Sequence, residues 1–294
     1  MVNETLVAVA GPFDWDRTVA RARQQNTHDV CLTRDGAARW ESVVATEPGS
    51  PVGVAVVGLA GAIGVRSTAC DPAQHDAAVS AVASRFSVAA DADGFYGRLR
   101  DDPWLGPLAA RWWGLRPLRD ASPWVALARL ILGQQVSAAS HRTVVNRLLR
   151  RWGHPTVTPS GGAVAAWPDP ADLSAETMES LVAGGIPHRP AATLQRAARW
   201  AEDGGLVGEP HEVAKRLLTL QGVGPWTAAG VALFGWGDDD AVMESDLVLR
   251  RAAAALAQVG RPFTPRALAG RLEPYRPYRG WVCYLLWQEH RACR

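Results

Sequence analysis

The chain has 294 residues, enough for two domains of ordinary size, and its 48% of hydrophobic residues can fill a sizeable core. It contains no apolar run of roughly 18 residues and no secretory signal at its start, so we expect a cytoplasmic protein outside the membrane. The net charge of +2 is too small to indicate a nucleic-acid binder by itself, and four scattered cysteines exclude a disulfide framework and a zinc finger.

The first 89 residues predict a small antiparallel sheet domain with flanking helices. Short apolar runs alternate with turns rich in Gly, Pro and Asp, which is typical of neighbouring strands. Strands are expected at residues 5–9, 29–33, 37–46, 51–59 and 62–65, and helices at residues 14–24 and 72–86. This domain, residues 1–89, indicates no function by itself.

From about residue 90 onward, helical spacing replaces the strand patterns. Helices are expected at residues 95–99, 105–113, 123–152, 173–183, 190–201, 210–220, 225–236, 246–258, 264–272 and 277–289. Residues 153–174 are rich in Pro, Gly and Asp and predict a connector. The predicted fold class is α+β, with a small antiparallel sheet domain followed by a mostly α-helical domain at residues 90–294.

Charged residues are distributed unevenly along the helical part. Between Ser245 and Arg294, nine Arg stand against three acidic residues, which predicts either a phosphate-facing surface or an ordinary solvated one. The acidic residues 238–240 indicate a solvated turn. Lys215 is the single lysine of the chain, so chemistry that needs a side-chain Schiff base has one candidate.

Residues 218–236 predict a helix, a tight turn and a second helix. Gly222, Val223 and Gly224 form the turn, and Pro225 suits the first position of the following helix. Main-chain N–H groups of such a turn, with the positive end of the helix, can hold a phosphate oxygen. The alternative is a plain tight turn. A dinucleotide fingerprint is disfavoured because a third glycine and a preceding strand are missing.

Polar side chains occur at two further positions of the helical part, one inside an expected helix and one just before another. Gly133, Gln134 and Gln135 interrupt the helical pattern of residues 123–152. They indicate either a helix break or a close helix crossing, or two amides directed at a base. Asp246 precedes an Ala-rich helix, where it can be an N-cap, an isolated catalytic carboxylate, or both.

Four motifs together resemble the helix–hairpin–helix DNA glycosylase superfamily. They are LQGVGPWTA at residues 220–228 with an Asp 20 residues beyond its Trp, ILGQQVS at 131–137, PYRGWVCYLLW at 277–287 and GPFDW at 11–15. The last resembles the start of the bacterial inducible 3-methyladenine DNA glycosylase II class, so the resemblance spans essentially the whole chain. It implies a monomeric enzyme of base excision repair that acts on double-stranded DNA. Such an enzyme rotates a damaged, alkylated purine out of the stack and hydrolyses its N-glycosidic bond.

The resemblance implies a catalytic residue and a base pocket. Asp246 would stabilise the oxocarbenium-like state and orient the attacking water, because a carboxylate favours positive charge developing on the sugar. The pocket would be formed by Trp226, Trp287, Leu247 and Gly230. Stacking on electron-rich indoles favours a cationic purine, whereas the alternative for each Trp is a place in the core.

The resemblance also implies contacts with DNA. The residues implied are Gly222, Val223, Gly224, Thr227, Gln134 and Gln135. Gln135 stands where the related enzyme has the wedge that fills the space of the rotated base. A Na⁺ or K⁺ ion would be held by the main-chain carbonyls of Leu218, Leu220 and Val223.

Members of the superfamily that also cleave the DNA strand carry a nucleophilic Lys at the position of Trp226. Because Lys215 lies before the turn instead, we expect a monofunctional glycosylase without lyase activity. Members with an iron–sulfur cluster end in four clustered Cys, whereas only Cys283 and Cys293 lie near this end. We therefore expect no iron–sulfur cluster, no zinc and no other cofactor.

The chain also departs from the 3-methyladenine class in its pocket. Gly230 and Leu247 stand where that enzyme has aromatic residues, and a third such position falls near Arg21. The pocket is therefore expected to be less aromatic. A glycosylase for deaminated or other neutral lesions, and a non-catalytic helix–hairpin–helix module that binds damaged DNA, remain alternatives.

Overall fold

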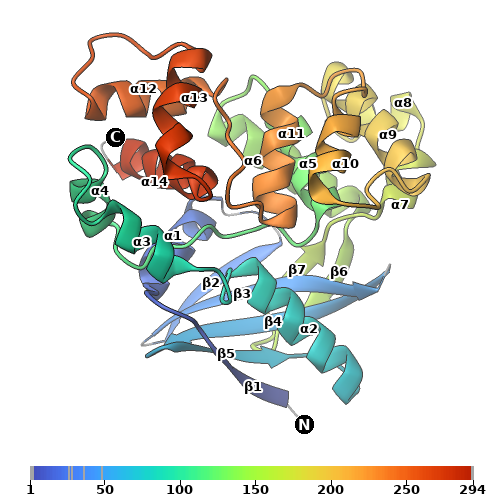
Figure 1. Ribbon diagram of the computed structural model, residues 1–294. Coiled ribbons are helices and arrows are strands. Elements are labelled where there is room, and N and C mark those ends of the chain that lie inside the picture. The colour runs from blue at the N-terminus through green and yellow to red at the C-terminus, as the bar shows by residue number, and fades with distance from the viewer. Residues whose placement is uncertain (1–2, 26, 28, 36, 48, 293–294) are drawn as a thin grey trace.

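The computed structural model describes residues 3–25, 27, 29–35, 37–47 and 49–292. The first part of the chain forms a five-stranded antiparallel sheet with the strand order β1-β5-β4-β3-β2 (Figure 1). The strands are β1 (Asn3–Ala8), β2 (Val30–Asp35), β3 (Ala37–Glu47), β4 (Ser50–Leu59) and β5 (Ala62–Ser67). Two helices accompany them, α1 (Trp15–Gln25) and α2 (Pro72–Arg85).

The sheet packs on a core of valines and aromatic rings. Trp40 of β3 is fully buried and meets Phe86 edge to face, with 5.2 Å between the ring centroids. Helix α2 begins at Pro72 because the side chain of Asp71 accepts a hydrogen bond from the main-chain nitrogen of Gln74. The prediction of a small antiparallel sheet followed by a mostly helical part is confirmed.

The helical part forms two groups that lie on the same side of the sheet in Figure 1. One group comprises α5 (Pro123–Leu132), α6 (Ala138–Trp152), α7 (Pro170–Ser174), α8 (Met178–Ala183), α9 (His188–Glu202), α10 (Pro210–Leu217) and α11 (Pro225–Val231). The other comprises α3 (Ala92–Leu99), α4 (Gly106–Arg111), α12 (Leu247–Leu256), α13 (Pro265–Leu272), the 3₁₀ turn η2 (Glu273–Tyr275) and α14 (Arg279–Ala292). Each group has a hydrophobic core, and α11 continues into the π-helix η1 (Ala232–Trp236), which joins both cores. None of the helices among the described residues is long and apolar enough to cross a membrane.

The single helix expected at residues 123–152 is wrong. Helix α5 ends at Leu132, and α6 begins at Ala138 after Ser137, whose hydroxyl accepts a hydrogen bond from the main-chain nitrogen of Ser140. Gln135, between them, has the left-handed φ of 57°, which no helix contains. The amides at this position therefore mark a helix break that exposes a loop.

The connector expected at residues 153–174 contains a β-hairpin that the sequence did not reveal. Its strands, β6 (His154–Val157) and β7 (Ala163–Ala166), have only four residues each. The hairpin packs on β3 and β4. A Cβ on Gly53 of β4 would lie 1.9 Å from the carbonyl oxygen of Val157, so the two backbones touch directly. The helix expected at residues 173–183 is also divided, because α7 ends before the N-cap Thr177 of α8.

A buried arginine fixes the GPFDW segment to the helical part. Arg116 has no exposed surface, and its guanidinium donates to the carbonyl oxygens of Ser87 at 2.6 Å, Pro12 at 3.1 Å and Ala10. Its charge also lies over the ring of Phe13, 5.7 Å from the centroid. Burial lowers the pKa of Arg116 from its usual value. Residues 10–13 are thus held by main-chain contacts to one side chain.

The acidic turn at residues 238–240 is not solvated as expected. The Asp239 carboxylate accepts the indole N–H of Trp281 at 2.7 Å, and its burial raises its pKa. Asp240 receives two hydrogen bonds from the guanidinium of Arg279, at 2.8 and 2.7 Å, one from its main-chain N–H at 3.4 Å, and one from Arg276 at 2.5 Å. Burial alone would raise the pKa of Asp240, but these arginine contacts outweigh it and lower the pKa. The turn therefore anchors the start of α14.

Candidate functional site

The carboxylate of Asp246 lies where three helices meet. It caps α12, because Oδ1 accepts the main-chain N–H of Leu249 at 2.8 Å. Oδ2 accepts the indole N–H of Trp226 from α11 at 2.8 Å, and Oδ1 is 3.4 Å from the indole nitrogen of Trp287 on α14. The N-cap and the isolated carboxylate are therefore the same arrangement, and three predicted site residues are brought together.

These contacts fix the carboxylate in orientation and leave it partly open. Asp246 is half-buried, and each of its oxygens accepts at least one N–H group. Turning the carboxylate would break a bond to α11 or to α12. Oδ1 faces two N–H groups, whereas Oδ2 accepts one and keeps a second lone pair for a further group on the open side. The arrangement suits a fixed negative charge beside a bound substrate.

The two indoles differ in the surface that they offer. Trp287 is only 9% exposed, and its ring stacks on Phe234 with 5.8 Å between centroids and an interplanar angle of 23°. Trp226 is half-buried at the edge of the core. Stacking on a base requires an open ring face. Trp226 therefore fits the predicted pocket wall, whereas Trp287 in this conformation packs in the core and orients Asp246.

The other two predicted pocket residues also differ from each other. Leu247 is 42% exposed next to Asp246, as a residue at the rim of a pocket would be. Gly230 is buried in α11, where an added Cβ would lie 2.8 Å from Cδ1 of Leu130 and 3.1 Å from Cε of Met243. The glycine allows α11 and α5 to pack closely, and its place in the pocket stays a prediction. Leu130 and Met243 fill the space, and no motif pointed to them.

The two glycines of the turn between α10 and α11 have different structural tasks. Gly222 has a φ of 94°, and a Cβ there would lie 2.4 Å from Oγ1 of Thr193 on α9. Gly224 has an ordinary φ of −111°, and a Cβ there would meet no described atom within 4 Å. Gly222 is therefore required by the fold of the turn. Gly224 leaves open space in front of the first turn of α11.

Two residues predicted to contact DNA are hydrogen-bonded to each other. Nε2 of Gln134 donates to the carbonyl oxygen of Gly222 at 2.9 Å and to Oγ1 of Thr227 at 3.0 Å. Thr227 is only 1% exposed, so its hydroxyl lies beneath the surface. This hydroxyl is therefore engaged within the protein, and the predicted contact of Thr227 with DNA stays a prediction. Gln135 is exposed at the tip of the adjacent loop, as a wedge would be.

The carbonyl groups expected to hold a cation lie in one short turn. The carbonyl oxygen of Leu220 accepts the N–H of Val223 at 2.9 Å, which leaves its second lone pair. Leu218 is half-exposed at the start of the turn. Carbonyl oxygens are hard donors that suit Na⁺ or K⁺, so the residues present fit such an ion.

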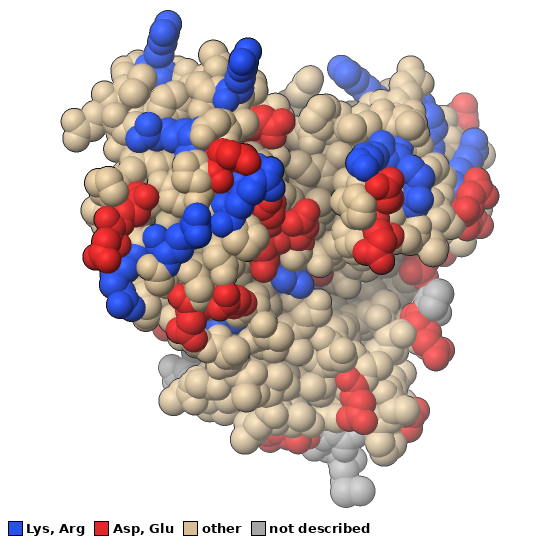
Figure 2. Space-filling view, in the orientation of Figure 1, with Lys and Arg blue, Asp and Glu red and all other residues tan. Residues whose placement is uncertain are grey.

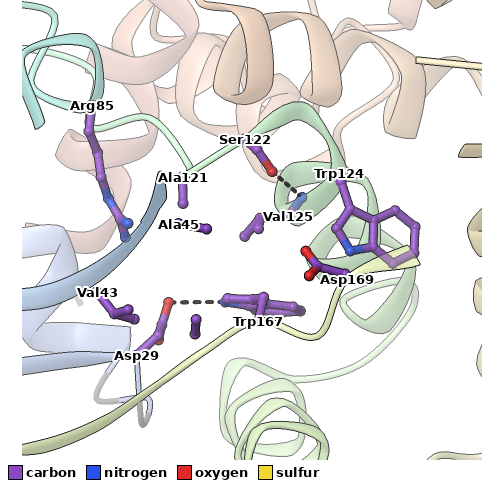
Figure 3. A pocket seen from close by; sticks show the side chains of 11 residues that line it. Asp29, Val43, Ala45, Arg85, Ala121, Ser122, Trp124, Val125, Trp167 and Asp169 are labelled. Atoms are coloured by element: carbon purple, nitrogen blue, oxygen red, sulfur yellow. Dashed lines mark hydrogen bonds between the residues drawn. The ribbon is translucent and has the colours of Figure 1, made fainter. Parts of the chain in front are cut away.

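A cavity and a polar cluster lie away from the predicted site residues. A cavity of about 70 Å³ separates β3 from the start of α5 (Figure 3), and the described residues that line it include no predicted site residue. Nε2 of His154 lies 2.8 Å from Oδ2 of Asp172 and 3.8 Å from Oδ2 of Asp169. Those oxygens already accept the main-chain N–H groups of Asp169 and Gly49, at 2.7 and 2.9 Å. The cluster is a capping box of α7 closed by a histidine.

The basic surface lies on the helical part. Figure 2 shows Lys and Arg side chains over the two helical groups, while the sheet end of this face carries mainly acidic and uncharged residues. Of the C-terminal arginines, Arg276 and Arg279 are paired with Asp240 and Glu273. Arg251, Arg261 and Arg266 are exposed. The positive charge available to phosphates is therefore smaller than the number of C-terminal arginines in the sequence suggests. It is nevertheless concentrated on one part of the molecule.

Curated relatives match part of the chain. No family model matches it. The probable bifunctional transcriptional activator/DNA repair enzyme AlkA of Mycobacterium tuberculosis is 31% identical over 202 residues, which are 67% of this chain and 40% of that protein. The putative DNA-3-methyladenine glycosylase YfjP of Bacillus subtilis is 22% identical over 175 residues, 58% of this chain and 59% of that protein. The chain thus spans about half the length of these relatives.

Solved structures match over nearly the whole chain. A 3-methyladenine DNA glycosylase from Archaeoglobus fulgidus has a TM-score of 0.85 at 18% identity and covers 98% of both chains. An 8-oxoguanine glycosylase/lyase from Clostridium acetobutylicum, in complex with double-stranded DNA, has a TM-score of 0.76 at 17% identity, covering 100% of this chain and 98% of its own. The chain therefore has the fold of the helix–hairpin–helix DNA glycosylases and resembles, in sequence, AlkA and the 3-methyladenine DNA glycosylases.

Proposed function

We propose that the chain is a monofunctional DNA glycosylase that hydrolyses the N-glycosidic bond of an alkylated purine in double-stranded DNA. The observation that supports this reaction most directly is the carboxylate of Asp246, held by the indole N–H groups of Trp226 and Trp287. As the bond between C1′ and the base breaks, its electrons leave with the base and positive charge develops on the sugar. The nearby carboxylate stabilises that charge and orients a water, which adds to C1′ and loses a proton to the solvent, while the cationic base leaves as a neutral molecule.

The hairpin supplies the contact with the DNA backbone in this proposal. The open space at Gly224 supports a phosphate approaching the main-chain N–H groups at the start of α11. Gln135, exposed at the tip of its loop, enters the stack in place of the rotated base. A monovalent cation at the carbonyls of Leu218, Leu220 and Val223 would add positive charge beside the phosphate.

The absence of a lyase step is supported by the place of the single lysine. Lys215 lies on α10, where it is 69% exposed and forms an ion pair with Glu212 at 2.8 Å. Trp226 occupies the position at which a nucleophilic amine is implied. Water is therefore the nucleophile, and the product is an intact abasic site. A covalent adduct trapped by borohydride with damaged DNA would contradict this step.

The alkylated purine is supported by the names of the relatives and by the partly exposed indole of Trp226, which can stack on a cationic ring. One observation favours a second candidate, a glycosylase for neutral lesions. Trp287 is stacked on Phe234, and Leu130 and Met243 fill the space beside Gly230, so the pocket offers less aromatic surface to a cation.

A base-release panel tests both candidates. The chain is incubated with duplexes that contain methylated purines, hypoxanthine or uracil, and the free bases are separated and quantified. Release of methylated purines above the others supports the first candidate, and release of hypoxanthine or uracil alone supports the second. If the chain binds these duplexes but releases no base, it is a non-catalytic damage-binding module.

The variant Asp246→Asn tests the assigned chemistry. We expect its single-turnover rate of base release to fall at least about 100-fold, because the amide has no charge to place near the sugar. Asp101→Asn is the matched control, since Asp101 is an exposed residue outside the site. Equal release by wild type and Asp246→Asn would remove Asp246 from the mechanism.

A further inference from the structure

The side chain of Gln134 joins three parts of the site. It belongs to the loop between α5 and α6, and its Nε2 donates to the carbonyl oxygen of Gly222 at 2.9 Å and to Oγ1 of Thr227 at 3.0 Å. Gly222 lies in the hairpin turn, and Thr227 follows Trp226 on α11. One amide group therefore connects the loop, the hairpin and α11, whose Trp226 donates a hydrogen bond to Asp246.

The hydrogen-bonding capacity of this nitrogen is fully used. An amide nitrogen carries two hydrogens, and each has an acceptor within the protein. Because Thr227 is 1% exposed, its contact with Gln134 lies beneath the surface rather than in a groove that a base could enter. Nε2 has no hydrogen left to donate to DNA in this conformation.

The neighbouring residue shows what the bridge holds in place. Gln135 is exposed and has a φ of 57°, a region that residues with a side chain rarely adopt. Such a backbone persists when its surroundings fix it. Gln134 attaches one side of the loop to the hairpin, and Ser137 attaches the other side to α6 as its N-cap.

We propose that Gln134 is a positioning residue that couples the loop of Gln135 to the phosphate-binding hairpin. It does not read a base. Gripping a phosphate at the hairpin then places Gln135 at the stack in the same step. The inference rests on the proposed function in so far as Gln135 enters the DNA stack.

The test is a double-mutant cycle of Gln134→Ala and Thr227→Val on the full chain. The probe is a duplex with 2-aminopurine opposite a tetrahydrofuran abasic-site analogue, whose emission changes when a side chain enters the stack. Affinity for the same duplex, carrying a fluorescein label, is measured separately by anisotropy. Gln135→Gly removes the side chain that enters the stack, and glycine tolerates the positive φ at this position. If this variant gives no emission change, the emission change of the wild type reports the insertion of Gln135.

We expect Gln134→Ala, which removes both hydrogen bonds, to weaken the insertion equilibrium by about tenfold, while duplex affinity stays within about threefold. Thr227→Val leaves the bond to Gly222 in place and should weaken insertion by about threefold. The double variant should lose about tenfold, like Gln134→Ala alone, rather than about 30-fold, because the bond that Thr227→Val removes is already lost in Gln134→Ala. Thr227→Ser keeps the hydroxyl and should restore insertion to within about twofold. If Gln134 only stabilised the fold, its loss would lower the emission change and the duplex affinity together, in proportion to the unfolded fraction. All measurements are therefore made at a temperature at which thermal unfolding curves show that every variant is folded.

Multiplicative effects of the two substitutions would overturn the proposal, and so would a silent Thr227→Val with a large affinity loss in Gln134→Ala. The latter result would mean that Gln134 contacts DNA directly. Wild type without any emission change would also overturn it. None of these measurements needs base release, so failure of the proposed reaction is detected separately in the base-release panel.

Discussion

The indole nitrogen of Trp226 lies 2.8 Å from Oδ2 of Asp246, which joins the open aromatic wall and the carboxylate into one unit. The N–H group donates in the plane of the indole, so this hydrogen bond occupies neither face of the ring. A substitution of Trp226 therefore affects two tasks, and the chemistry of the replacement decides which one is lost.

Trp226→Phe separates these tasks. The phenyl ring keeps an aromatic face but cannot donate to Asp246, so we expect the single-turnover rate of base release to fall about tenfold with little change in DNA affinity. Trp113→Phe is the control, because Trp113 is 45% exposed and packs on Tyr96. A loss of affinity at an unchanged rate would contradict the role of the N–H group.

Gly222→Ala should lower stability, whereas Gly224→Ala should weaken DNA binding. Alanine at 222 must adopt a positive φ and press on Thr193, so we expect a loss of about 1–3 kcal/mol in the free energy of unfolding. Alanine at 224 should leave thermal stability unchanged within about 0.5 kcal/mol but weaken DNA binding, because its methyl group enters the open space. Calorimetry and anisotropy with a duplex check the pair, and equal behaviour of the two variants would refute the distinction.

Asp240 should contribute to stability in a pH-dependent manner. Its pKa in the folded protein is lowered, because contacts with Arg279 and Arg276 outweigh the effect of burial. Its stabilising contribution is therefore present above its usual pKa of 3.8 and is lost as the pH falls through the lowered value. We expect Asp240→Asn to cost about 1–2 kcal/mol at pH 7 and to flatten the decline of stability below about pH 4.

Urea unfolding at a series of pH values measures this effect, with Asp101→Asn as the exposed control. Curves for wild type and Asp240→Asn that run parallel through the acidic range would show that Asp240 has no such contribution.

Two cysteines should differ in reactivity. Burial raises the pKa of the Cys283 thiol to about 12, and the residue has no exposed surface, whereas Cys70 is exposed. At pH 8 we expect an alkylating reagent to label Cys70 in the native protein and Cys283 only after unfolding. Peptide mass spectrometry after timed labelling checks this, and early modification of Cys283 would indicate that α14 opens in the native state.

The local parts of the site could be predicted from sequence because their signals are local. The Gly-Val-Gly turn, the Pro at the helix start and the carboxylate at an N-cap each lie within a few residues. The different tasks of the two glycines could not be predicted, because they depend on Thr193 of another helix. The burial of Trp287 depends in the same way on Phe234.

The acidic turn shows why charge patterns mislead without tertiary partners. Three consecutive Asp are typical of a solvated turn, yet Arg279, 39 residues further along the chain, reaches Asp240. No periodicity in the sequence reveals such a pair. Likewise, four-residue strands such as β6 are too short for an alternating pattern to distinguish them from a connector.

The hairpin of β6 and β7 has a consequence for exchanging parts of this molecule with those of its relatives. Val164 and Ala166 of β7 are buried together with Val43 of β3, and Gly53 leaves no gap beneath Val157. If the sheet domain were separated from the rest of the chain near residue 89, the apolar surface of β3 and β4 beneath the hairpin would be exposed to water. A transplanted sheet would therefore have to carry residues 154–166 with it, or receive a new cover for β3 and β4.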